Sequence, residues 1–269
     1  MSPIVHFPPF SPDPRGNKLK KYKVTETKTG DPVVLLCGPK EITDMLLAWY
    51  ANSCSRIALS DKGAESWTDA IRFPAGVPDG LPDLLQRLQG WLTLCTRPDV
   101  NLGTSIDWFK RADELGNLVN TDMGRRVNFT KYAPYPNGSS SRQARGELHD
   151  AMVDLVENHP VYASTRLVTS PPGSAGDGNS FGERLGRVVA QRTGKRYIAT
   201  TGPARPPQKE EGERVVRDDF VLSESVSERI LVIDDVFYTG ITLDATARAA
   251  RRAGATEVIT LTAARTLRR

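Results

Sequence analysis

The chain has 269 residues, of which 39% are hydrophobic and 25% charged, and its formal net charge is +4. This composition is typical of a soluble protein with one large domain or two small ones. The sequence has no apolar run near the ~20 residues that span a bilayer and no basic-then-apolar start of the secretory kind, so we expect a cytoplasmic protein that does not contact a membrane.

The first part of the chain mixes strand and helix patterns without a recognisable functional motif. Short apolar and β-branched runs predict strands, and apolar residues spaced three and four apart predict helices. The predicted strands cover residues 22–27, 32–38 and 56–59, and the predicted helices cover 40–52, 81–94 and 107–119. We therefore expect residues 1–124 to be an N-terminal extension or a small α/β domain, whose role the sequence leaves open.

A stretch rich in Pro, Gly and Ser at residues 131–141 is the best candidate for a domain boundary, with an alternative near Asn120. Proline and glycine interrupt regular secondary structure, and such stretches often separate domains. We accordingly expect two domains, residues 1–124 and residues 125–269.

After this stretch, helices and strands alternate regularly. The predicted elements are helices at 143–157, 181–193 and 243–253, and strands at 166–169, 196–199, 230–233 and 257–263. Such alternation indicates a parallel sheet with helices on both faces. Ligands of these sheets bind beyond the carboxyl ends of the strands. The sequence therefore predicts an α/β fold with a binding site at that edge.

Residues 230–243 form the most informative motif. Four apolar residues that predict a buried strand precede Asp234 and Asp235, and a loop with Thr239, Gly240 and Thr242 then leads into a helix. At a helix N-terminus, backbone N–H groups and the helix dipole attract phosphate. We therefore expect a ligand with both phosphate and hydroxyl groups, with a divalent metal as an added partner. The alternative is an ordinary polar strand end followed by a turn.

This stretch resembles the phosphoribosyl-pyrophosphate (PRPP) signature of the type I phosphoribosyltransferases. The resemblance implies a Rossmann-like, parallel-sheet phosphoribosyltransferase core over residues 125–269, preceded by the α/β extension. It implies that Asp234 and Asp235 are the catalytic pair that holds the ribose 2′- and 3′-hydroxyls, and that Mg²⁺ binds near this pair, mainly through PRPP. The residues implied to bind the 5′-phosphate are Tyr238, Thr239, Gly240, Ile241 and Thr242.

Two positions of the loop depart from the family pattern. Tyr238 stands where many members carry Thr or Asp, and in some members that Asp serves as a base, so no general base is carried over to this chain. Ile241 stands where many members carry Gly or Ala. Because the loop binds phosphate largely through backbone N–H groups, the isoleucine is compatible with binding.

Two further segments take on roles through the same resemblance. The loop at residues 170–178 follows a predicted strand and corresponds to a loop that lies against the pyrophosphate; its implied binding residues are Ser170, Gly173 and Ser174. The segment 200–219 resembles a loop that closes over PRPP, with Arg205 and Lys209 covering the leaving group. The alternative for that segment is an ordinary solvated loop, since it carries its own acidic residues.

Within the family, the order of motifs over residues 125–269 is most similar to the ComF-like branch. The Pro-rich exit at Val168–Pro172 and the helix that begins at Phe181 carry this similarity. That branch often opens with a cysteine zinc ribbon. Here the three cysteines are far apart and form no Cys-x-x-Cys pair, so neither a zinc ribbon nor a disulfide framework is predicted.

Two classes of function follow from the resemblance. The first is a pentosyltransferase that moves 5-phosphoribose from PRPP to a nitrogen of a nucleobase-like heterocycle and releases pyrophosphate. The alternative is a non-catalytic protein that senses PRPP or a nucleotide and contacts a protein or a nucleic acid. The sequence does not identify the acceptor, because a variable region of the fold reads it.

The expected partners are therefore PRPP, a small heterocyclic acceptor and a second copy of the chain in a homodimer. A nucleic acid is suggested only by local positive charge, at Arg248, Arg251 and Arg252 and in the basic C-terminal tail. The same arginines fit a solvated helix face and would also favour anionic phosphate substrates.

Overall fold

The computed structural model describes residues 16–27, 29–95, 97–132, 138–204 and 219–267. The chain forms two compact units, Met1–Cys95 and Thr96–Arg269. In the part of the chain that the structure describes, no helix combines the length and the apolar character needed to cross a membrane.

The first unit contains a four-stranded antiparallel sheet in the order β1-β2-β4-β3. Its strands are β1 (Lys21–Glu26), β2 (Pro32–Cys37), β3 (Ser55–Ile57) and β4 (Asp69–Arg72), and the unit also contains β5 (Leu92–Leu94), which is not a strand of this sheet. Its helices are α1 (Lys40–Trp49), α2 (Asp61–Ala64) and α3 (Leu81–Leu88). The core of this unit is built from aliphatic side chains of β2, α1, β4 and α3 together with Phe73.

The helix predicted at 40–52 is confirmed by α1, whereas the helix predicted at 81–94 is too long. Helix α3 ends at Leu88, and the chain turns at Gly90, whose N–H donates to the carbonyl of Arg87 at 2.8 Å. The following residues are extended, and Thr93 exchanges two backbone hydrogen bonds with Asn17, each of 2.9 Å. This long-range pairing, which periodicity cannot show, replaces the last helical turns.

The second unit is built on a parallel sheet whose strands follow the order β10-β9-β13-β14-β6. The bounds are β6 (Leu102–Trp108), β9 (Leu167–Thr169), β10 (Arg196–Tyr197), β13 (Ile230–Phe237) and β14 (Val258–Arg265). Two small antiparallel pairs accompany it, β7 (Lys110–Ala112) with β8 (Leu118–Asn120), and β11 (Thr200–Thr201) with β12 (Val221–Leu222). Every residue of β14 is buried, as expected for a strand covered on both faces.

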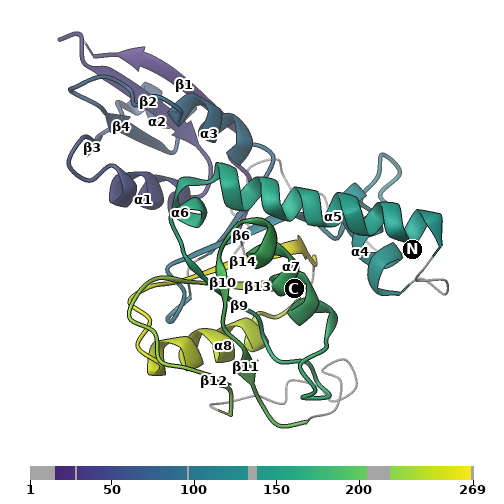
Figure 1. Ribbon diagram of the computed structural model, residues 1–269. Helices are drawn as coiled ribbons and strands as arrows, with labels where there is room; N and C mark the ends of the chain where they lie inside the picture. Colours follow the sequence, from purple (N-terminus) through teal and green to yellow (C-terminus); the bar gives the residue numbers. More distant parts are fainter. Residues whose placement is uncertain (1–15, 28, 96, 133–137, 205–218, 268–269) are drawn as a thin grey trace. The chain divides into compact units, whose positions relative to one another are not determined.

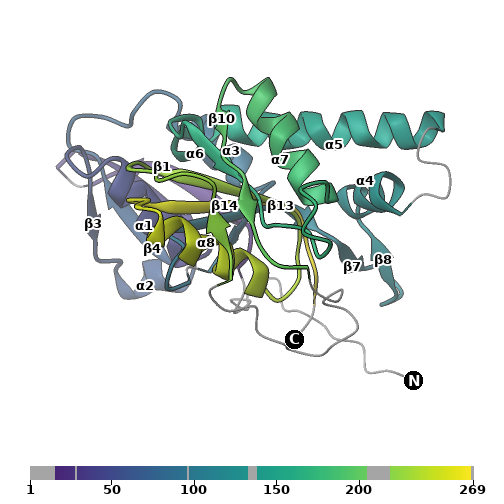
Figure 2. The same cartoon turned by 60° about the horizontal axis from the view of Figure 1, so that its bottom comes forward.

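Helices cover both faces of this parallel sheet. They are α4 (Asp122–Lys131), α5 (Ser139–Asn158), α6 (Pro160–Ala163), α7 (Phe181–Arg192) and α8 (Ile241–Arg252). Within this unit, α5 and α7 lie on one side of the strands and α8 lies on the other (Figures 1 and 2). The predicted α/β class, with a parallel sheet between helical layers, is confirmed.

The helix predicted at 107–119 is wrong. The segment begins within β6 and continues as the β7–β8 hairpin. The Asp113 carboxylate holds the hairpin turn by accepting from the N–H groups of Leu115 at 2.9 Å and Asn117 at 2.8 Å, and Gly116 has a φ of 82°. An Asp side chain that accepts hydrogen bonds from the backbone N–H groups of the next residues competes with helix formation. The segment therefore forms a turn, although its apolar residues have helical spacing.

The structure also divides the chain at a different place from the expected boundary. The position between residues 124 and 125 falls inside α4, and the two compact units divide between Cys95 and Thr96. The reason is that β6 pairs in parallel with β14 from Leu102 to Trp108 and so belongs to the second unit's sheet. Helix α4 itself was not predicted, although Thr121 caps it by accepting from the N–H of Gly124 at 3.0 Å.

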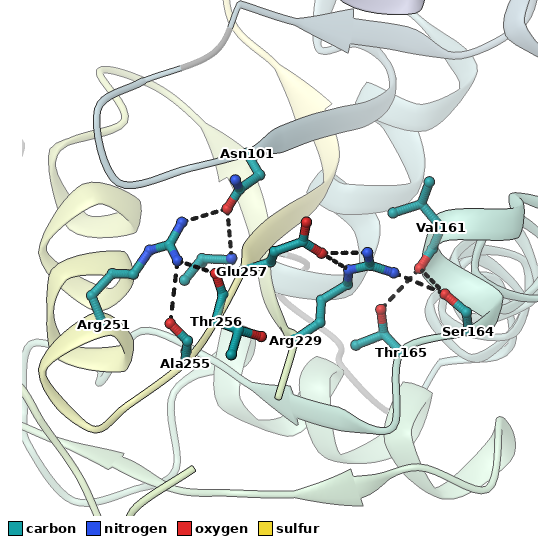
Figure 3. Close-up of polar contacts among 10 residues, drawn as sticks. Asn101, Val161, Ser164, Thr165, Arg229, Arg251, Ala255, Thr256 and Glu257 are labelled. Atoms are coloured by element: carbon teal, nitrogen blue, oxygen red, sulfur yellow. Dashed lines mark hydrogen bonds and ion pairs between the residues drawn. The ribbon is translucent and has the colours of Figure 1, made fainter. Parts of the chain in front are cut away.

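Polar side chains fasten the amino ends of the parallel strands to one another (Figure 3). Arg229, directly before β13, donates to Glu257, directly before β14, and to the Ser164 hydroxyl at 3.0 Å. Asn101, directly before β6, accepts from the N–H of Val258 at 2.9 Å and from Arg251 at 2.5 Å. Arg251 also donates to the carbonyl of Thr256, so the end of α8 is fixed to the start of β14.

We predict that Asn101→Ala lowers the free energy of unfolding by about 1–3 kcal/mol, because the buried N–H of Val258 loses its acceptor. Chemical denaturation followed by circular dichroism measures this change. The matched control is Asn179→Ala, which alters an exposed asparagine of the same unit and should change stability little. Equal stability of the two variants would show that the Asn101 contacts do not stabilise the sheet.

Candidate functional site

The acid pair Asp234–Asp235 lies on the part of β13 that extends beyond its neighbour β9. The strand runs to Phe237, so the predicted strand at 230–233 is too short. Pairing with β9 ends at Val232, whereas pairing with β14 continues to Phe237. The pair is thus held by a central strand and is no longer covered by β9, at the carboxyl edge where α/β sheets bind ligands.

Asp234 is closely surrounded. Its Oδ1 accepts from the backbone N–H of Asp235 at 2.8 Å. A Cβ atom placed on Gly182, in the first turn of α7, would lie only 2.7 Å from the same oxygen, so glycine alone lets the helix approach this carboxyl group. Burial, and next the neighbouring Asp235 carboxylate, raise the pKa of Asp234 well above its usual value.

Lys131, the last residue of α4, forms an ion pair with Asp235. Asp235 is only 6% exposed. The Lys131 ammonium also lies 5.9 Å from the centre of the Phe181 ring and 5.5 Å from that of Tyr132. Burial alone lowers the pKa of Lys131, but the Asp235 and Asp234 carboxylates reverse this effect and raise it above the usual value. The acid pair therefore carries its own counter-cation.

The loop 238–242 follows directly and opens helix α8. The helix begins at Ile241, two residues earlier than predicted, and Gly240 is its N-cap with a φ of 82°. The first helical hydrogen bond runs from the N–H of Asp244 to the carbonyl of Gly240 at 2.8 Å. The N–H groups of the preceding three residues have no acceptor within the helix and face the end where anions bind.

Arg97, outside the motif, contacts this loop. Its Nη1 donates to the carbonyl of Thr239 at 3.2 Å, and its Nη2 donates to the Asp244 carboxylate at 2.5 Å. The guanidinium also lies 5.9 Å from the centre of the Phe237 ring. Burial raises the pKa of Asp244, and Arg97 opposes that rise. The first turn of α8, beside the loop, thus carries a carboxylate that Arg97 offsets.

The loop 170–178 lies beside α7, and its predicted binding residues differ in accessibility. Ser170 is 0% exposed, and its hydroxyl packs where a Cβ of Gly186 would lie, so its side chain does not face a ligand. The N–H of Gly173 donates to Glu183 at 3.2 Å. Ser174 is exposed. Of these three residues, Ser174 is the one whose side chain is exposed at the turn of this loop.

Glu183 orders this loop by a capping box at the start of α7. Its carboxylate accepts from the N–H of Ser180 at 2.9 Å, and the Ser180 hydroxyl accepts from the N–H of Glu183 at 3.2 Å. The third bond, from Gly173, ties the loop to the helix. Gly176 lies against the carbonyl of Gly202. The predicted cations Arg205 and Lys209 belong to the segment 205–218 and lie outside the described residues.

The donor atoms of the acid pair suit a hard cation. Carboxylate oxygens are the ligands that Mg²⁺ prefers. Among the described residues, however, no group of three or more His, Cys, Asp or Glu side chains could hold a metal ion, and Asp235 is already paired with Lys131. The residues therefore fit a metal that takes most of its ligands from a bound phosphate compound.

Sequence reasoning located the acid pair and the loop but missed their supporting residues. Lys131 and Asp235 are 104 positions apart, and Arg97 and Asp244 are 147 apart. No local sequence pattern predicts ion pairs between residues so far apart in the chain. Glu183 could have been found, because Ser180 and Glu183 have the spacing of a capping box before an apolar helix. A cap was also visible at Thr121-Asp122, which begin the helix that carries Lys131.

No protein-family model matches the chain, and no curated protein matches it significantly. Among solved structures it is similar to an orotate phosphoribosyltransferase from Aeropyrum pernix, with 16% identity, 57% of this chain and 71% of that chain covered, and a TM-score of 0.33. An adenine phosphoribosyltransferase from Thermoanaerobacter pseudethanolicus is also 16% identical, with 48% and 83% covered and a TM-score of 0.34.

A third similar structure is the adenine phosphoribosyltransferase from Trypanosoma brucei in complex with AMP, pyrophosphate and ribose-5-phosphate. It is 14% identical, with 65% of this chain and 86% of that chain covered and a TM-score of 0.35. At such identities a likeness concerns the fold alone, and TM-scores this low locate no residue of a site. The ComF-like branch is not addressed by these neighbours and stays a prediction.

We predict that Asp234→Asn stabilises the protein at neutral pH. A carboxyl group whose pKa is higher in the folded than in the unfolded chain binds more protons when folded, so stability falls as pH rises from about 4 toward the folded pKa. Asparagine keeps the acceptor for the N–H of Asp235 and removes this loss. The variant should match the wild type below about pH 4 and exceed it at higher pH.

Thermal unfolding at a series of pH values checks this. Asp79→Asn, which removes the same charge from an exposed position, is the control and should show no growing difference. If Asp234→Asn is less stable than the wild type at neutral pH, Asp234 is not the costly buried acid described above.

Proposed function

We propose that the chain is a phosphoribosyltransferase that transfers 5-phosphoribose from PRPP to a nitrogen of a heterocyclic acceptor and releases pyrophosphate. The observation that carries the proposal is the position of the acid pair. Asp234 and Asp235 stand at the uncovered end of a central parallel strand, and the loop that opens α8 follows three residues later. The proposed diol-binding pair and the proposed phosphate-binding loop are thus adjacent along the chain. Such closeness is needed if both are to bind the same ribose 5-phosphate.

In this proposal the acid pair orients the ribose ring. Carboxylate oxygens accept hydrogen bonds from the 2′- and 3′-hydroxyls, which fixes the face of the ring that the acceptor attacks. Lys131 holds the Asp235 side chain in place through its ion pair. Asp234 is fixed by the N–H of Asp235 and by the close approach of Gly182. The side chains are therefore held before the ligand arrives, which reduces the entropy lost on binding.

The loop 238–242 binds the 5′-phosphate in the same proposal. Its backbone N–H groups and the N-terminus of α8 supply partial positive charge. Tyr238, Thr239, Gly240, Ile241 and Thr242 then act mainly through the backbone, so the side chain of Ile241 does not oppose the assignment.

The reaction breaks the bond between ribose C1 and a pyrophosphate oxygen and forms a bond between C1 and the acceptor nitrogen. Positive charge develops on C1 as the bond to pyrophosphate breaks, and the nitrogen's proton passes to solvent as the new bond forms. The negative charge of the acid pair favours that positive charge. Mg²⁺, held by the ligand's oxygens and by this acid pair, would neutralise the departing pyrophosphate. Loop 170–178, including Ser174, lies on the side of α7 and is proposed to contact that pyrophosphate.

The test is pyrophosphate release from PRPP with Mg²⁺, screened over nucleobases and small heterocycles. We predict release with at least one acceptor by the wild type and none by the Asp234→Asn/Asp235→Asn double variant. The double variant keeps the shape of both side chains and removes both charges. The control is Asp79→Asn, an exposed charge change in the first unit, which should keep full activity.

Unchanged release by the double variant would contradict the assigned role of the acid pair. PRPP binding in calorimetry without release against the whole panel would instead support the sensor alternative. Absence of PRPP binding by the wild type would contradict the proposed site itself.

A further inference from the structure

Arg97 is placed to control the loop that opens α8. It lies in a turn closed by a hydrogen bond from the N–H of Val100 to the carbonyl of Arg97 at 3.0 Å. Residues 97–101 run beside α8, because Arg97 contacts Asp244 in its first turn and Asn101 contacts Arg251 in its last. The arginine is thereby held at the N-terminal end of the helix by the chain itself.

The contact with Thr239 fixes the orientation of one peptide unit. The carbonyl of Thr239 accepts from Arg97 Nη1 at 3.2 Å. In a trans peptide the carbonyl and the following N–H point in opposite directions. The N–H of Gly240 therefore points away from Arg97. A Cβ on Gly240 would lie 2.8 Å from Arg97 Nη1, so the absence of a side chain there permits this close approach.

The contact with Asp244 removes an obstacle to anion binding. A carboxylate in the first turn stabilises a free helix but repels a phosphate at the same end. Arg97 Nη2 lies 2.5 Å from Asp244 Oδ2, and the Asp244 side chain is only 17% exposed. The other oxygen, Oδ1, is buried and has no hydrogen-bond partner among the described residues. Arg97 is thus hydrogen-bonded to this carboxylate, and the charge of Arg248 acts on it as well.

We propose that Arg97 is a positioning residue of the 5′-phosphate loop: it turns the N–H of Gly240 away from itself toward the ligand side, and it neutralises Asp244 beside the bound phosphate. This inference rests on the proposed function. It assigns a role to a residue that lies outside the motif and contacts the carbonyl of Thr239, the Asp244 carboxylate and the Phe237 ring. The positive φ of Gly240 and the close approach of Arg97 both favour glycine at position 240.

The test measures binding of ribose 5-phosphate and of pyrophosphate separately by calorimetry. Arg97→Ala should weaken ribose 5-phosphate binding about tenfold or more, as expected for loss of charge-assisted hydrogen bonds, and leave pyrophosphate binding within about twofold. Arg97→Lys, which keeps the charge but cannot bridge both partners, should give an intermediate loss. Arg192→Ala is the control, since it removes a comparable Arg–Asp pair of 2.8 Å on α7.

The second arm removes the carboxylate. In Arg97→Ala/Asp244→Asn the repulsion is gone, so ribose 5-phosphate binding should recover part of the loss. The amide resonance of Gly240 should shift on addition of ribose 5-phosphate in the wild type and much less in Arg97→Ala. Should Arg97→Ala fail to fold, Arg97→Lys with and without Asp244→Asn makes the same comparison.

Three outcomes would overturn the inference. They are ribose 5-phosphate binding by Arg97→Ala within twofold of wild type, equal loss of both ligands, and no recovery on adding Asp244→Asn. In all three, wild-type binding of ribose 5-phosphate leaves the proposed function standing. Failure of the wild type to bind ribose 5-phosphate or PRPP contradicts the proposed function and, with it, the role of Arg97.

Discussion

The site depends on one electrostatic constraint: three carboxylates stand where an anionic ligand is proposed to bind. Asp234 and Asp235 are enclosed at the end of β13, and Asp244 lies in the first turn of α8. Without partners such groups are costly to bury and repel phosphate. Lys131 offsets Asp235 and Arg97 offsets Asp244, whereas burial and the neighbouring Asp235 carboxylate raise the pKa of Asp234 and so favour its neutral form.

Both cations come from segments far from the motif, so they meet the carboxylates only in the folded chain. Helix α4 brings Lys131, and the turn before β6 brings Arg97. At the opposite edge, the amino ends of the strands carry Arg–Glu and Arg–Asn contacts that satisfy one another (Figure 3). The edge at the amino ends of the strands is therefore held by polar side chains that bind one another. The edge at the carboxyl ends carries carboxylates, whose partners are cations or the proposed ligand.

What the sequence reveals follows from the range of the interactions. Fourteen successive residues, from 230 to 243, contain the acid pair, the loop and the start of α8. Their pattern can therefore be recognised from the sequence. Helix α7 was likewise predicted, and Gly194, with a φ of 65°, closes it as expected. The helix predicted at 107–119 failed because Asp113 and Gly116 form a local turn and because β6 gains its stability from β14.

The supporting residues fall outside what such patterns can show. A lysine at the end of a helix and an arginine before a strand look like ordinary surface charges. Only the packing of α4 and of the turn 97–100 reveals their partners. The same holds for Gly182, whose role is to leave room for the Asp234 carboxyl group.

The state of Asp234 gives the strongest physical reason to regard this edge as functional. Burial and a neighbouring carboxylate hold its pKa well above the usual value, so the charged form of this carboxyl group is disfavoured in the fold. An asparagine of the same shape would make the same backbone contact without carrying a charge. Groups with strongly perturbed pKa values concentrate at sites where a ligand or a reaction needs them. Hydroxyl donors of a bound ribose, as in the proposed function, would hydrogen-bond this carboxylate and favour its charged form.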